Sequence, residues 1–158
     1  MPRQPKAEEA EEAEEAERFT LLAPKLPGKS PRFFYFVEIH PDDVSMNRGL
    51  AELQGRSPKA VAKEKIVAAC LRYEFVPQKS EEEAFKHIAP IGTLFFSQPT
   101  VSPSVVAHEL AHAAIGWCRR VKLDPTKNTP SARHAFDQEE MFASCLQTFT
   151  KQFWDARP

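Results

Sequence analysis

The chain has 158 residues, of which 42% are hydrophobic and 27% are charged, so it is long enough for one domain with a sizeable core. Its formal net charge of −1 combines two unlike parts: residues 1–20 hold seven Glu against three basic residues, a net −4, and residues 21–158 hold 18 basic and 15 acidic residues, a net +3. Neither part is basic enough to indicate a nucleic-acid-binding protein. No apolar run approaches the roughly 20 residues of a membrane-spanning helix, and the polar, acidic start does not resemble a secretory signal. We therefore expect a cytoplasmic protein.

The N-terminal segment is the most biased in composition. Residues 7–17 repeat Glu and Ala with a period of three, and like charges without an apolar stripe favour a solvated tail over a packed helix. We expect an acidic, disordered tail over 1–20, a proline-containing linker over 21–31 and one folded domain over 32–158. A tail that docks on a partner is the functional alternative for the first part.

Three cysteines, Cys70, Cys118 and Cys145, are spaced too widely for a CxxC motif or a disulfide framework. We expect three buried or half-buried thiols in a reducing compartment. Cys118 or Cys145 as a catalytic nucleophile has no supporting signature in the sequence.

The domain alternates between strand-like and helix-like segments. Aromatic and β-branched runs favour strands, and the dipeptides Ser57-Pro58 and Ser102-Pro103 are typical helix starts. In chain order we expect a strand over 32–39, a short helix within 41–56 ending near Gly55, a helix over 59–75, a short helix over 80–87, a strand over 91–97, a helix over 103–117, a polar loop over 122–133 and a last helix over 136–154. This order predicts an α+β fold with a small sheet.

The segment that carries chemistry is His108-Glu109-Leu110-Ala111-His112, an HExxH motif on a predicted helix. Histidines four residues apart lie one turn apart on the same helix face, so both imidazoles can bind one metal ion. The Glu between them is placed to take a proton from a zinc-activated water, whose pKa zinc lowers to about 7. The sequence therefore predicts a Zn2+ site with His108 and His112 as ligands and Glu109 as general base.

A catalytic zinc ion of this kind needs a third protein ligand. The motif does not continue as HExxHxxGxxH, which argues against the metzincin pattern. Downstream candidates are His134, Asp137, Glu139 and Glu140, and the last helix brings the two glutamates. The apolar stripe of that helix favours Glu139, whereas the small residues that follow favour Glu140.

The combination of HELAH with the later EEMFASCLQ resembles the gluzincin branch of the zincin metallopeptidases. It is also similar to small cytosolic or phage-encoded zincin domains of the ImmA/IrrE-like kind, over roughly residues 90–155. The resemblance implies a minimal zincin-like fold, with a small sheet packed on the HExxH helix and a C-terminal helix that bears the glutamate ligand. In that register the third ligand is Glu140, because Ala143 follows it three residues later. It further implies hydrolysis of a peptide bond in a protein or peptide substrate.

Lesser expectations concern the surroundings of the motif. His134, Tyr73 and Arg119 are candidates for stabilising a developing oxyanion, and His40 and His87 are expected to be surface or satisfied residues. In zincins an edge strand near the metal pairs with extended substrate, and the strand over 93–97 is a candidate for that role, with a plain core strand as the alternative. A zincin fold kept as a catalytically idle, protein-binding module with a structural metal is the alternative to an enzyme.

Overall fold

The computed structural model describes residues 15–26, 31–73, 88–124 and 138–157. They form the expected α+β fold, built on a four-stranded sheet in the order β1-β2-β4-β3. The strands are β1 (Glu17–Leu22), β2 (Arg32–His40), β3 (Ala68–Arg72) and β4 (Ile88–Ser97). The two central strands β2 and β4 run parallel, and each edge strand pairs antiparallel with its neighbour.

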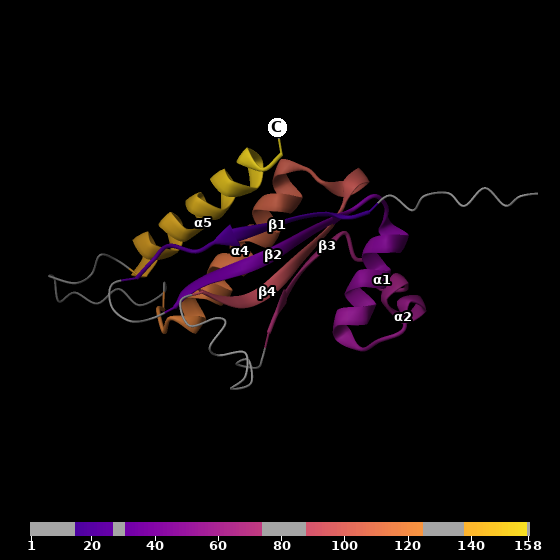
Figure 1. The fold of residues 1–158 in the computed structure, drawn as a ribbon, viewed down its shortest axis with the longest axis horizontal. Coiled ribbons are helices and arrows are strands. Elements are labelled where there is room, and N and C mark those ends of the chain that lie inside the picture. The colour runs from indigo at the N-terminus through magenta and orange to yellow at the C-terminus, as the bar shows by residue number, and fades with distance from the viewer. Residues whose placement is uncertain (1–14, 27–30, 74–87, 125–137, 158) are drawn as a thin grey trace, which may run out of the picture.

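Helices cover both faces of this sheet (Figure 1). The long helices α4 (Pro103–Arg120) and α5 (Gln138–Asp155) pack against each other, and they also contact β3, β4 and β1. The shorter helices α1 (Asp43–Gln54) and α2 (Pro58–Ala62) pack with β2 and β4 and with each other, while a 3-10 turn, η1 (Gln98–Thr100), leads from β4 into α4. Within the described residues no helix is long and apolar enough to cross a membrane.

Each face of the sheet has its own hydrophobic cluster. The larger one lies under α4 and α5, where Trp117, Phe149 and Phe153 are fully buried against β2 and β4 side chains such as Val37 and Phe96. The smaller one joins α1 and α2 to Phe95 of β4. Because side chains alternate along a strand, Ala68 and Cys70 of β3 pack on the larger cluster and Ala69 and Leu71 on the smaller one.

Several predicted elements are confirmed. β2 covers the expected strand at 32–39, and β4 covers 91–97 and begins three residues earlier. The expected short helix is α1, which begins after an Asp42 side-chain cap and ends at Gly55, whose φ of 62° is left-handed and suits glycine. α4 begins at the expected Ser102 cap and runs three residues beyond Trp117.

The helix expected over 59–75 is wrong. Only α2 is helical there, and Lys65 takes a left-handed φ of 52° before the chain turns into β3. The alanine-rich sequence has helical spacing, but pairing with the apolar β4 buries the same residues as a strand. The expected helix over 80–87 lies outside the described residues.

The expected boundary at residue 20 also needs correction, because it falls inside a strand that the sequence analysis did not predict. β1 begins at Glu17 and pairs with β2, and its Leu21 is fully buried. Phe19 of β1 packs edge-to-face on Phe153 of α5 at 5.5 Å. The folded part therefore begins by residue 17, and the segment 17–22 belongs to the sheet rather than to a tail or linker.

Candidate functional site

Helix α4 presents the HExxH motif at the boundary between core and surface. Its apolar side, which includes Val106, Leu110 and Ala113, is buried against the sheet. His108 and His112 lie on the exposed side of the helix, as the spacing predicts. Glu109 is buried between these two sides with 7% of its surface exposed.

The two histidines face each other. Their Nε2 atoms lie 3.2 Å apart, with the rings nearly perpendicular. Two nitrogen ligands at about 2.05 Å from one tetrahedral zinc ion would be about 3.3 Å apart, so the pair has the spacing that such an ion requires. The nitrogen chemistry and spacing of these two groups therefore fit zinc.

The carboxylate of Glu109 lies beside the first histidine, with Oε1 4.0 Å from His108 Nε2. Burial raises the pKa of this carboxyl above the usual value for glutamate, and the neighbouring imidazoles lower it in part. The backbone N–H of Cys70 on β3 acts in the same direction as the imidazoles. Glu109 therefore lies beside the histidines with an increased basicity, which suits a general base.

A hollow of about 300 Å³ opens at Glu109. It is lined from the α4 side by Ser104, Val105, His108 and Glu109, and from the β3 side by Val67 and Ala68. The motif is therefore not covered by the described residues on this side.

Strand β3 forms one edge of the sheet, and no described strand pairs with its outer side. Tyr73 donates its backbone N–H to Ile91 of β4, so the backbone groups of Cys70 and Arg72, at alternate positions, point to the free edge. The N–H of Cys70 faces Glu109 accordingly. The edge strand beside the motif is thus β3, whereas β4, which holds the predicted segment 93–97, is a buried core strand.

The third ligand is not placed beside the histidines. Among the described residues, which include Glu139 and Glu140, no group of three His, Cys, Asp or Glu side chains could hold a metal ion. Both glutamates are exposed in the first turn of α5, where Gln138 accepts a hydrogen bond from the backbone N–H of Asp124, just beyond the end of α4. The motif lies in the middle of α4, and His112 is about two turns before the end of the helix. His134 and Asp137 lie outside the described residues.

Other predicted residues take different positions. Tyr73 uses its hydroxyl in a 2.7 Å hydrogen bond to Thr93 Oγ1, and Arg119 lies two turns beyond His112. His40 is buried, 3.1 Å from Glu38 and stacked on Phe95, so it is a satisfied residue as expected, whereas His87 is outside the described residues.

The cysteines are free thiols. Cys118 and Cys145 are buried and Cys70 is half-buried. Burial raises the pKa of all three, to about 12 for Cys70 and about 11 for Cys118, so they are poorly suited to act as nucleophiles.

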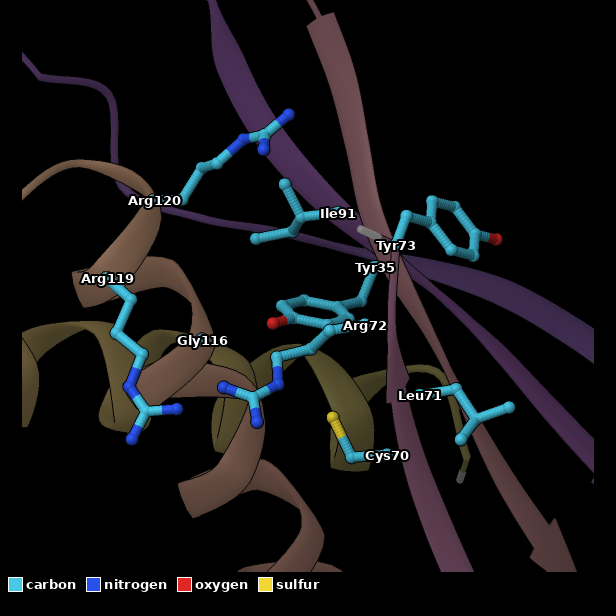
Figure 2. A pocket seen from close by; sticks show the side chains of 9 residues that line it. All are labelled: Tyr35, Cys70, Leu71, Arg72, Tyr73, Ile91, Gly116, Arg119 and Arg120. Carbon is cyan, nitrogen blue, oxygen red and sulfur yellow. The ribbon is translucent and has the colours of Figure 1, made fainter. Parts of the chain in front are cut away.

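A second and larger hollow, of about 480 Å³, lies between β3 and the end of α4, and the sequence analysis did not predict it (Figure 2). Tyr35, Arg72, Arg119 and Arg120 line it together with Gly116. These residues come from two strands and a helix that are distant in sequence, so no local pattern joins them.

Comparisons of the chain with protein-family models, with curated proteins and with solved structures found no match. The functional assignment therefore depends on the motif and its geometry.

Proposed function

We propose that the protein is a zinc-dependent peptidase that hydrolyses a peptide bond with Glu109 as general base. The observation that carries this proposal is the spacing of His108 and His112, whose Nε2 atoms lie 3.2 Å apart beside the buried carboxylate of Glu109. A buried carboxylate beside two exposed histidines would be costly without a role, and a metal ion at the histidines would give it one.

His108 and His112 would hold the metal ion. Bound there, zinc would supply Lewis acidity, which polarises a carbonyl and makes a water acidic. The third protein ligand has to come from another residue. Glu140 is the candidate from the resemblance, and it requires the first turn of α5 to lie closer to the histidines than it does in this structure. Glu139, His134 and Asp137 are the alternatives.

Glu109 would take a proton from the water that attacks the carbonyl carbon and pass it to the leaving amine nitrogen. Its raised pKa makes it a stronger base than an exposed glutamate, and the N–H of Cys70 orients the carboxylate. The Cys70 N–H is used by Glu109, so the Cys70 carbonyl and the outward backbone groups of Arg72 remain to pair with an extended peptide, and the reacting carbonyl would lie next to Glu109.

The alternative is a catalytically idle binding module with a structural metal. A structural site is closed by four protein ligands, whereas a catalytic site keeps one position open. The exposed side chain of His108 and the 300 Å³ hollow at Glu109 favour the open kind of site.

The first prediction is that Glu109→Gln abolishes hydrolysis while zinc stays bound, because the amide cannot accept the proton. Peptide cleavage would be followed by mass spectrometry on a mixed decapeptide library, and the metal content by elemental analysis. Loss of a general base typically lowers the rate about 10²–10⁴-fold. Glu52→Gln, at an exposed glutamate of α1, is the matched control and should cleave like the wild type.

Metal analysis separates the ligands. His108→Ala should lose zinc, and among Glu140→Gln, Glu139→Gln, His134→Ala and Asp137→Asn the variant with the largest loss identifies the third ligand. The proposal would be contradicted if the wild-type protein, purified from zinc-containing medium, held no zinc. It would also be contradicted if the Glu109→Gln variant cleaved at the wild-type rate.

A further inference from the structure

The larger hollow contains an unusual tyrosine. Tyr35 of β2 is fully buried, and its hydroxyl has no hydrogen-bond partner among the described residues. Leaving such a donor unpaired in the interior is costly, so a hydrogen-bond acceptor brought by a ligand into the hollow would satisfy it.

Two glycines make room for this side chain. Gly92 lies between Tyr35 and Arg72 in the sheet register, and a Cβ there would be 2.7 Å from the tyrosine ring. On α4, a Cβ at Gly116 would be 2.3 Å from the Tyr35 hydroxyl and 2.8 Å from Cδ of Arg72. The hydroxyl thus reaches the wall of the hollow because both positions lack a side chain.

The hollow is also strongly basic. Arg72, Arg119 and Arg120 line it, and within the described part of the chain none of them forms an ion pair with a carboxylate. Figure 2 shows the guanidinium groups of Arg72 and Arg119 directed toward each other from β3 and α4, whereas Arg120 points away, over the ring of Phe33. Arginines in the last turn suit the helix dipole, but that does not account for Arg72 on the strand.

The position of the hollow relates it to the motif. The N–H of Cys70 faces Glu109. Arg72 lies two residues after Cys70, which is about 7 Å along a strand. Gly116 follows Glu109 by seven residues, which is about 10 Å along a helix. A peptide extended along the free edge of β3 would therefore reach the arginines about two or three residues from the bond at Glu109.

We propose that this hollow is a carboxylate subsite of the peptidase, formed by Arg72, Arg119 and the Tyr35 hydroxyl. The ligand group is an acidic side chain, or the C-terminal carboxylate, two or three residues from the scissile bond. Arginine pairs with carboxylates in a fork geometry, and the tyrosine hydroxyl donates the additional hydrogen bond. The assignment of this hollow as a substrate subsite rests on the proposed peptidase function.

The test measures binding separately from cleavage. Fluorescein-labelled decapeptide libraries with a fixed Glu or a fixed Gln, each with a free or an amidated C-terminus, are titrated against the full-length Glu109→Gln protein and followed by anisotropy. We expect at least a fivefold tighter binding of the carboxylate-bearing set. A preference set by the fixed Glu identifies an acidic side chain, and one set by the free terminus identifies the C-terminal carboxylate.

Further variants in the Glu109→Gln background test which residues produce the preference for carboxylate-bearing peptides. Arg72→Gln and Arg119→Gln should abolish it, while Arg48→Gln on α1, which removes the same charge from an exposed site, should leave it intact. Tyr35→Phe should reduce the preference without lowering the melting temperature, since the hydroxyl it removes has no described partner. Arg119 is exposed on a helix, so its variant should fold even if the Arg72 variant does not.

The outcomes for the two proposals differ. Equal binding of all four libraries, or a preference that survives both arginine variants, overturns the subsite. Cleavage by the wild type without any preference for the acidic side chain or for the free C-terminus overturns the subsite and leaves the peptidase. A preference lost in both arginine variants, together with no cleavage by the wild type, supports the subsite and overturns the peptidase.

Discussion

Cys70 links the two hollows through different atoms. Its backbone N–H faces the Glu109 carboxylate, and its side chain lines the hollow that holds Arg72. Burial is the main reason that its pKa rises to about 12, and the charge of Glu109 adds to the effect. Burial, with a smaller contribution from the neighbouring carboxylate, therefore keeps this thiol neutral and makes it a packing group rather than a nucleophile.

This shift predicts a pH dependence of stability. The folded state holds the Cys70 proton up to about pH 12, whereas the unfolded state releases it near the ordinary thiol pKa of 9.0. The stabilisation is therefore complete below pH 9 and is lost as the pH rises toward 12. Between pH 8 and pH 10 this thiol should lower the free energy of unfolding by about 1 kcal/mol.

The measurement is urea unfolding at pH 8, 9 and 10 under reducing conditions, for wild type and Cys70→Ser. The serine does not ionise in this range, so the variant should lose about 1 kcal/mol less stability than the wild type on the way to pH 10. Identical pH profiles for the two proteins would show that Cys70 titrates normally in the folded state.

At the scale of elements, the sequence predicts helices with clear caps and strands with apolar runs. α4 begins at the predicted Ser102 cap, α1 ends at the predicted Gly55, and β2 has the expected aromatic run. The strands β3 and β1 were not predicted, because their short local strand signals are outweighed by the sequence around them. β3 has helical spacing, and β1 follows a run of Glu and Ala, so tertiary pairing with β4 and β2 decides both.

The same limit applies to the candidate site. The HExxH motif lies within one helix, so its spacing alone predicts which side chains meet. The carboxylate subsite joins β2, β3 and α4 and depends on two glycines that leave space, which no linear pattern records.

The Gln152 side chain of α5 closes the outer edge of β1 at Leu22. The Gln152 side chain of α5 accepts a hydrogen bond from the Leu22 N–H at 2.8 Å and donates one to the Leu22 carbonyl at 2.9 Å. Gln152→Ala would leave both backbone groups without this partner, so the free energy of unfolding should fall by about 1–3 kcal/mol. Gln147→Ala, at an exposed glutamine of the same helix, should change it by less than about 0.5 kcal/mol. Urea unfolding that gives equal values for the two variants would contradict this contact.

The whole molecule is a sheet between two helical layers, and the candidate site lies at one edge of it. α4 contributes the motif, and β3 contributes the free edge and one arginine, so the site depends on how these two elements are held together. The opposite edge, β1, is far from the motif in sheet order, yet it packs on α5, which in turn packs on α4. Stability at β1 should therefore affect the layer that carries the histidines.

Truncation tests this connection. Removing residues 1–22 deletes β1, including the buried Leu21 and the contact of Phe19 with Phe153. Loss of two large apolar side chains from the core should lower the free energy of unfolding by about 3–5 kcal/mol, with weaker zinc binding as a consequence. Removing residues 1–14 deletes five of the seven N-terminal glutamates and keeps β1, so the melting temperature and zinc affinity should match those of the full chain. Equal stability of the two truncated proteins would show that β1 does not support the helical layer, and loss of peptide cleavage in the shorter truncation would assign the function to the acidic segment instead.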